Sequence, residues 1–201
     1  FSKAFVQLLP QVKTVYNDKT KEDKEFNPGT IVCSDSQTAL IPHFMATESQ
    51  KSGSYYDDDI KPTYVAHNLG QGYVSTSSYK EMYINLGATF DQLQKVKNDP
   101  LYHEICATQN KKDEEGYFKN LIIGKDENLC IEDDLGEVSG VMLAIHYAKQ
   151  GYIPKITTVS EDYAKDVAYN PAVSPGLQKH LKELYEKNTF LGILNALNDP
   201  N

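Results

Sequence analysis

Short apolar runs typical of strands are mixed irregularly with segments of helical spacing along this chain. Strand-like runs are "TIVCS" at 30–34, "TYVAH" at 63–67, "YFKNLIIG" at 117–124 and "YIPKITTVS" at 152–160. Residues 78–97 and 136–150 instead repeat apolar side chains at helical intervals, with a break expected near Gly87. Because strand and helix do not alternate strictly, the sequence predicts an α+β fold.

Both ends of the chain predict helices. Residues 1–16 place apolar side chains on one helical stripe with a kink at Pro10, and the charged segment 17–29 is typical of a surface linker. Near the C-terminus, Ser174 can cap a helix and Pro175 suits its first position. The run "TFLGILNALN" beyond residue 188 is expected to add another apolar turn or two.

Composition excludes several classes of protein. The net charge of −8 argues against nucleic-acid binding, which needs dense cationic patches. No apolar run is long enough to span a membrane. All 20 basic residues are Lys, so no Arg can hold a phosphate or a carboxylate bidentately. Since the chain starts with Phe1 rather than Met, we expect a processed product whose targeting signal has been removed.

The three cysteines, Cys33, Cys106 and Cys130, are spread along the chain without a C-x-x-C motif. This spacing argues against a zinc site, and no metal is expected. One disulfide with one free thiol is compatible with the count, but the sequence does not give the pairing.

Three small hydroxyl residues, Ser75, Thr76 and Ser77, follow a strand-like start in "GYVSTS" at 72–77. A strand prefers bulkier side chains at such positions. One interpretation is a strand-to-helix turn with a hydroxyl cap, and the other is part of a nucleotide pocket.

Four separated stretches together resemble the ADP-ribosyltransferase toxins of the cholera, heat-labile enterotoxin and pertussis type. They are "TIVCSDSQ" at 30–37, "GYVSTS" at 72–77, "NLIIGKDENLCIEDDLG" at 120–136 and "GYIPKI" at 151–156. The resemblance implies two small mixed or antiparallel sheets around a cleft with peripheral helices. It also implies that the segments 30–36 and 72–77 are neighbouring strands that flank this cleft.

The resemblance also implies a division of the chain into three parts. Residues 1–29 would be an N-terminal helical extension and linker, and residues 30–160 the ADP-ribosyltransferase-like domain. Residues 161–201 would be a C-terminal helical segment packed on that domain. Toxins of this family cleave NAD and transfer ADP-ribose to a host protein. The residues implied in NAD binding are Asp35, His67, Ser75, Thr76 and Ser77.

Two catalytic positions depart from the family pattern. Cys33 stands where the family has an Arg that holds the dinucleotide phosphates, and His146 stands where it has the catalytic Glu. An imidazole cannot stabilise a cationic transition state as a carboxylate does. We therefore expect a secreted, catalytically inactive effector that binds a host protein and needs no cofactor. Its oligomeric state is open.

Three alternatives remain. The first is an active NAD-dependent transferase with a displaced carboxylate, for which Glu137 is the candidate, with Asp133 and Asp134 nearby. The second is that Cys33 and His146 meet beside Ser75 and form a nucleophilic or metal-binding pair. The opposing interpretation is that both side chains only fill a collapsed cleft. The third is an unrelated secreted α+β binding domain.

Overall fold

A computed structural model describes most of the chain. It covers residues 2–12, 14–17, 19–25, 28–52, 60–70, 73–124 and 128–193, without the side chains of 14–17 and 48–52. Gly72, at the start of the hydroxyl stretch, lies outside these residues. Helices and strands are mixed along the chain, as the sequence predicts.

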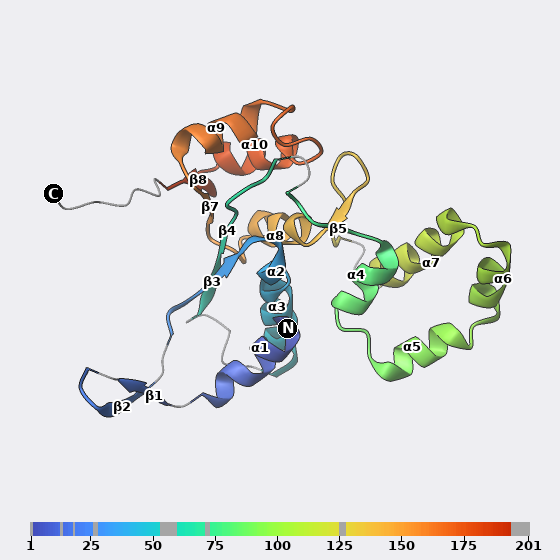
Figure 1. The fold of residues 1–201 in the computed structure, drawn as a ribbon, viewed down its shortest axis with the longest axis horizontal. Helices are drawn as coiled ribbons and strands as arrows, with labels where there is room; N and C mark the ends of the chain where they lie inside the picture. The colour runs from blue at the N-terminus through green and yellow to red at the C-terminus, as the bar shows by residue number, and fades with distance from the viewer. Residues whose placement is uncertain are drawn as a thin grey trace.

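The principal sheet has four parallel strands in the order β3-β4-β7-β8 (Figure 1). Its strands are β3 (Thr30–Ser34), β4 (Lys61–Val65), β7 (Ile156–Thr158) and β8 (Phe190–Gly192). Cys33 lies opposite Tyr64, which in turn lies opposite Ile156. Alternate residues of β3 and β4 are buried, so these strands present one face to the main core.

The parallel arrangement differs from the mixed or antiparallel sheets that we expected. Between β3 and β4 run the short helix α2 (Asp35–Thr38) and the longer α3 (Ile41–Ser52). A helix between two strands returns the chain to the same edge, which makes the strands parallel. The polar C-terminal part of α3 gave no helical signal in the sequence, and the strand–helix–strand unit was therefore missed.

Two helices, α9 (Glu161–Tyr169) and α10 (Gln178–Glu186), contact β8 and each other. Helix α8 (Gly140–Lys149) has seven buried residues and packs against α10 and α3. Helix α10 begins after the predicted start, because the Ser174 hydroxyl donates to the carbonyl of Val167 and caps no helix. The start of the apolar run after residue 188, predicted to be helical, forms β8, and the part of this run from residue 194 on lies outside the described residues.

A helical arm extends from the sheet (Figure 1). It consists of α4 (Tyr79–Asn85), α5 (Phe90–Lys97), α6 (Pro100–Thr108) and α7 (Lys111–Ile123). The predicted break at Gly87 is confirmed, since this residue has a φ of 87° that favours glycine. The strand predicted at 117–124 is wrong: Phe118 and Ile122, one helical turn apart, are buried in a second apolar cluster.

Smaller elements complete the structure. The first part of the chain forms α1 (Ser2–Leu8) and a 3-10 turn (Leu9–Gln11), followed by a hairpin of β1 (Thr14–Asn17) and β2 (Glu22–Glu25). The helix predicted over 1–16 is therefore wrong at its end, where β1 begins, and only β2 lies wholly in the predicted linker. Strand β5 (Thr76–Ser77) pairs with β6 (Val138–Ser139). The segments 30–36 and 72–77 are therefore not neighbouring strands, because β3 pairs with β4.

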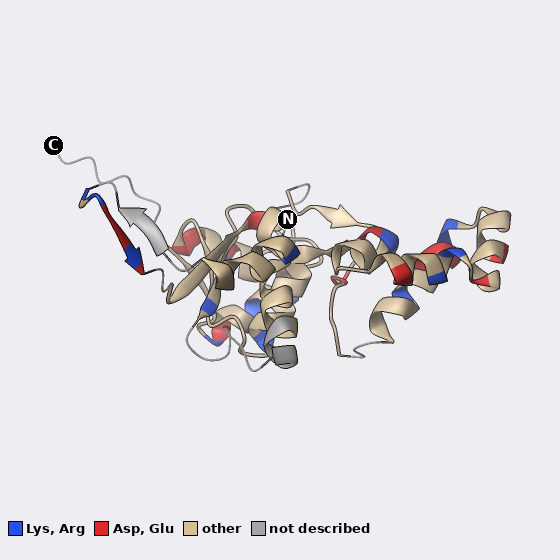
Figure 2. Cartoon of the chain, turned by 90° about the horizontal axis from the view of Figure 1, so that it is seen from below, with Lys and Arg blue, Asp and Glu red and all other residues tan. Residues whose placement is uncertain are grey.

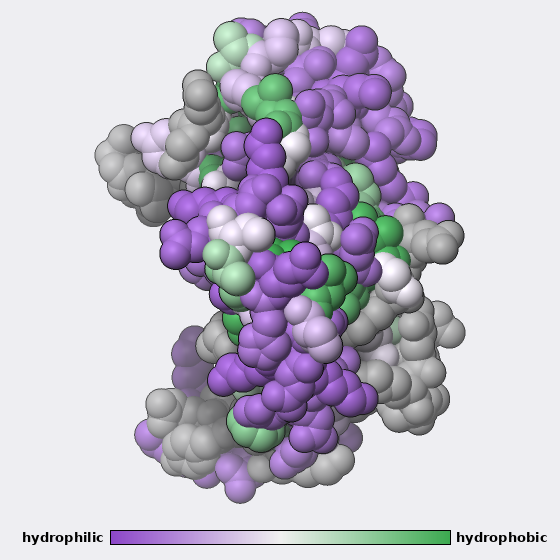
Figure 3. All heavy atoms as spheres, turned by 90° about the vertical axis from the view of Figure 1, so that its right-hand side faces the viewer, coloured by the Kyte–Doolittle hydropathy of each residue, from purple (hydrophilic) through white to green (hydrophobic). Residues whose placement is uncertain are grey.

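The surface is mostly polar. Lys residues and acidic residues of the helical arm are interspersed in Figure 2. The face seen in Figure 3 is largely hydrophilic, with smaller hydrophobic areas between the hydrophilic side chains. In the described part of the chain, no helix combines the length and the apolar character that crossing a membrane requires.

Candidate functional site

Two polar residues follow directly after neighbouring parallel strands. Asp35 comes after β3 and His67 lies two residues after β4, so both lie at the carboxyl edge of the sheet. Asp35 Oδ1 accepts a hydrogen bond of 2.9 Å from the backbone N–H of His67, and Oδ2 lies 2.8 Å from His67 Nδ1. A carboxylate only accepts hydrogen bonds, so Nδ1 carries the hydrogen. The second ring nitrogen, Nε2, is thereby left for another partner.

The backbone of Asp35 is in a left-handed conformation with a φ of 53°. Most residues with a Cβ avoid this conformation, although Asp tolerates it better than most. Here it follows β3 directly and lets both carboxylate oxygens turn toward the end of β4. Asp35 and His67 keep 38% and 49% of their side-chain surfaces exposed, so the pair is accessible to a ligand.

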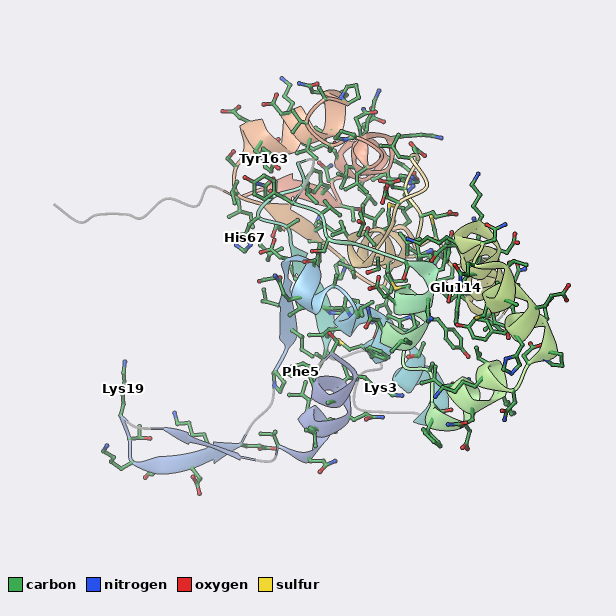
Figure 4. The ribbon with its side chains drawn as sticks, turned by 45° about the vertical axis from the view of Figure 1, so that its right-hand side comes forward. Lys3, Phe5, Lys19, His67, Glu114 and Tyr163 are labelled. Carbon is green, nitrogen blue, oxygen red and sulfur yellow. The ribbon has the colours of Figure 1, made fainter. Side chains whose placement is uncertain are left out.

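The segment after β4 is held in place from two other elements. The Thr158 hydroxyl, on β7, donates to the carbonyl of Ala66 at 2.6 Å. The Tyr163 hydroxyl, on α9, accepts from the backbone N–H of Leu69 at 2.8 Å and donates to Asn68 Oδ1 at 3.1 Å. His67 and Tyr163 lie on the same side of the molecule in Figure 4, away from Glu114 on the arm. The loop is therefore fixed before any ligand arrives.

Asp35 and His67 border a cleft of about 210 Å³. Its lining is mostly polar at the rim, where Ser36 donates to the hydroxyl of Ser75 at 3.2 Å. Tyr64 and Val141 add apolar surface. Of the residues expected to bind NAD, the cleft thus brings together Asp35, His67 and Ser75.

The other expected site residues lie elsewhere. Thr76 and Ser77 form β5, and Ser78 caps α4 with its side chain, so the hydroxyl stretch does end in the strand-to-helix turn. His146 lines a different cavity, of about 1110 Å³, and its Nδ1 accepts from the backbone N–H of Cys130 at 3.4 Å. Ser75 and His146 therefore line separate cavities.

Cys33 is fully buried on β3 in the main core. Burial raises the pKa of its thiol to about 12, so it carries no reactive thiolate at neutral pH. The described cysteines are all free. No group of three potential metal ligands occurs within the described residues. The buried, protonated thiol of Cys33 and the separate cavities of Ser75 and His146 argue against a nucleophilic pair of Cys33 and His146 beside Ser75.

The alternative carboxylate, Glu137, is exposed in the turn before β6. Its backbone N–H donates to Asp133 Oδ1, which also accepts from Leu135. Asp134 lies 3.3 Å from Nε2 of His180. The two aspartates thus have local contacts in the turn and with α10.

Sequence reasoning missed three residues of the site. Asn68 and Tyr163 fix the loop, and Tyr64 lines the cleft. The sequence did contain a signal for Asn68. The apolar runs "TIVCS" and "TYVA" are each followed by polar residues, Asp35 and His67–Asn68. Parallel strands bring such ends to one edge of a sheet. Nothing local in the sequence connects Tyr163 to this edge.

A family comparison covers most of the chain. The model described as the starch synthase catalytic domain matches residues 1–183, out of 201 in the sequence. The matched range contains the whole cleft and its supporting residues. No curated protein matches the chain.

The family match overturns the resemblance to ADP-ribosyltransferase toxins. The prediction of a toxin-like effector, whether inactive or active through Glu137, is therefore wrong. The expectation of secretion no longer has the support of the resemblance. The misleading motifs have structural explanations: "STS" contains the short strand β5 and precedes the helix cap Ser78, and "YIP" leads into β7 of a parallel sheet. The chain belongs to the starch synthase catalytic domain family.

Proposed function

We propose that this chain binds an activated glucosyl donor for the lengthening of a glucan, with the donor's sugar in the Asp35–His67 cleft. Family membership supports the glucosyl chemistry. Transfer of glucose requires a donor with a good leaving group, such as a nucleoside diphosphate. The observation that carries the proposal is the Asp35–His67 pair at the carboxyl ends of β3 and β4. Ligands of open parallel sheets bind outside this edge.

The cleft suits one sugar ring. Its volume of about 210 Å³ is below the roughly 300 to 1,000 Å³ of pockets that hold drug-sized ligands. A hexose presents hydroxyl groups that both donate and accept, and the rim offers a carboxylate, an imidazole and two serine hydroxyls. The remainder of a nucleotide donor would extend beyond this cleft.

Asp35 and His67 have different roles in this proposal. The Asp35 carboxylate accepts hydrogen bonds from sugar hydroxyls, and it fixes the His67 ring through Nδ1. The His67 Nε2 then bonds to the sugar. Their orientation is set in advance by the backbone N–H of His67, which also donates to Asp35. Such preorganisation lowers the cost of ordering the site on binding.

The test is donor binding by isothermal titration calorimetry with ADP-glucose and with UDP-glucose. We expect Asp35→Asn to weaken the binding of the preferred donor at least about tenfold, because a hydrogen bond to a charged group is worth about 1.5–3 kcal/mol. The matched control is Asp91→Asn, an exposed residue of α5, which should leave affinity unchanged. Absence of binding by the natural chain, or equal affinity of Asp35→Asn, would contradict the proposal.

A further inference from the structure

The hydroxyl of Tyr64 is the least satisfied polar group around the cleft. Tyr64 is only 1% exposed, and its hydroxyl has no hydrogen-bond partner among the described residues. Most buried polar groups in proteins are paired, since an unpaired one forfeits its hydration. By contrast, the Tyr163 hydroxyl, on α9, makes two hydrogen bonds. An unpaired hydroxyl beside a cleft requires an explanation.

The position of Tyr64 explains why a hydroxyl there differs from one in an ordinary core. The residue lies on β4 opposite Cys33, and it lines the same cleft as Asp35, His67 and Ser75. Burial, with the negative charge of Asp35 as a smaller cause, raises the pKa of the phenol. It therefore stays protonated and can donate a hydrogen bond. A phenylalanine would fill the same space without an unpaired polar atom.

We propose that Tyr64 is a further sugar-binding residue of the cleft, whose phenol hydroxyl forms its missing hydrogen bond with a hydroxyl group of the bound hexose. This inference rests on the proposed function, because it takes the ligand of the cleft to be a sugar. In the free protein the hydroxyl is a local cost. In the complex it forms one of the hydrogen bonds that position the sugar ring.

The proposal predicts that Tyr64→Phe acts with opposite signs on stability and on binding. Removing the unpaired hydroxyl should raise the melting temperature of the free protein by about 2–4 °C, the shift expected for about one such group in a chain of this size. The affinity for the preferred nucleoside diphosphate glucose should fall about three- to tenfold, as loss of one neutral hydrogen bond predicts. A purely structural residue would move both quantities in the same direction.

Tyr79→Phe is the matched control. Tyr79 is also a buried tyrosine, but it belongs to α4 of the arm, where Lys119 lies 5.3 Å from its ring centre. This variant should change the melting temperature without changing donor affinity. It therefore separates a general effect of losing a phenol hydroxyl from an effect at the cleft.

The outcomes distinguish this inference from the proposed function. If the natural chain binds no donor, the proposed function fails and this inference fails with it. If the natural chain binds donor and Asp35→Asn weakens binding, but Tyr64→Phe binds as well as the natural chain, only the role of Tyr64 is overturned. A lower melting temperature of Tyr64→Phe would also overturn it, because the hydroxyl would then be stabilising the free protein.

Discussion

Two contacts between a nitrogen and a carboxylate in this molecule have almost the same length but different surroundings. His67 Nδ1 lies 2.8 Å from Asp35, and Lys80 Nζ lies 2.9 Å from Glu114. The first pair is at the edge of the parallel sheet and borders a cleft. The second joins α4 to α7 in the helical arm, where the Tyr102 hydroxyl also donates to Glu114 at 3.0 Å.

The contrast teaches that a close contact between a nitrogen and a carboxylate does not by itself mark a functional site. In the arm, Lys80 donates hydrogen bonds to both Glu114 and Tyr102, and these three residues connect α4, α6 and α7. These contacts explain the position of Lys80 without a ligand. At the sheet edge, the pair borders a cleft at the carboxyl ends of two parallel strands. Ligands of open parallel sheets bind outside this edge. We therefore assign binding to the sheet edge and structural support to the arm.

The largest expected effect concerns the arm. Phe118 is 2% exposed and its ring packs on those of Tyr83, Tyr102 and Tyr117. Phe118→Ala should lower the free energy of unfolding of the arm by about 3–5 kcal/mol through lost burial and the cavity left behind. Chemical denaturation, with amide hydrogen exchange to locate the loss, measures the effect.

The control for this change is Glu104→Ala, an exposed residue of α6 that should have little effect on stability. Donor affinity at the cleft should survive Phe118→Ala wherever the sheet stays folded. Suppose that Phe118→Ala loses donor binding but retains exchange protection at β3 and β4. That result would contradict the assignment of donor binding to the sheet edge alone.

The smallest expected effect is an acid-dependent one beside the sheet. Salt bridges to Lys149, at 2.6 Å, and to Lys187 lower the pKa of Glu183 to about 2. A carboxyl group whose pKa is depressed by folding stabilises the protein above its unfolded pKa. This contribution is lost as the pH falls from about 4.5 toward about 2. Since 43% of the Glu183 side chain is exposed, it is worth at most about 1 kcal/mol.

Melting temperatures of Glu183→Gln and the natural chain, measured across this pH range, check the effect. The difference between them should shrink as the pH falls through the window, and Glu104→Gln should show no such trend. A constant difference would mean that the bridge between α8 and α10 does not depend on the charge of Glu183.

Much of the fold could be predicted from local patterns. The strands at 30–34 and 63–65, the helix break at Gly87 and the helix around Met142 follow from apolar spacing and turn chemistry. Helix α7 was predicted as a strand because its apolar residues are clustered in sequence. Only packing of Phe118 and Ile122 on α4 reveals the helical period.

The site was harder to predict, because its members meet only through topology. Asp35, His67 and Ser75 were singled out, but through a resemblance to a different family. Parallel pairing of β3 with β4 is what places Asp35 beside His67, and this pairing depends on the helix α3 that was missed. The Tyr163 hydroxyl on α9 bonds to the backbone N–H of Leu69, which lies 94 residues earlier in the chain. No local sequence pattern encodes such a contact.

The central claim is that the carboxyl edge of the parallel sheet, and not the helical arm, holds the sugar of the donor. Chemical-shift mapping of the isotope-labelled chain with the nucleoside diphosphate glucose it binds tests this directly. We predict that the amide signals of His67, Asn68 and Ser75 shift on titration while those of α5 and α6 stay in place. Shifts confined to the arm, or to the cavity beside His146, would contradict the account.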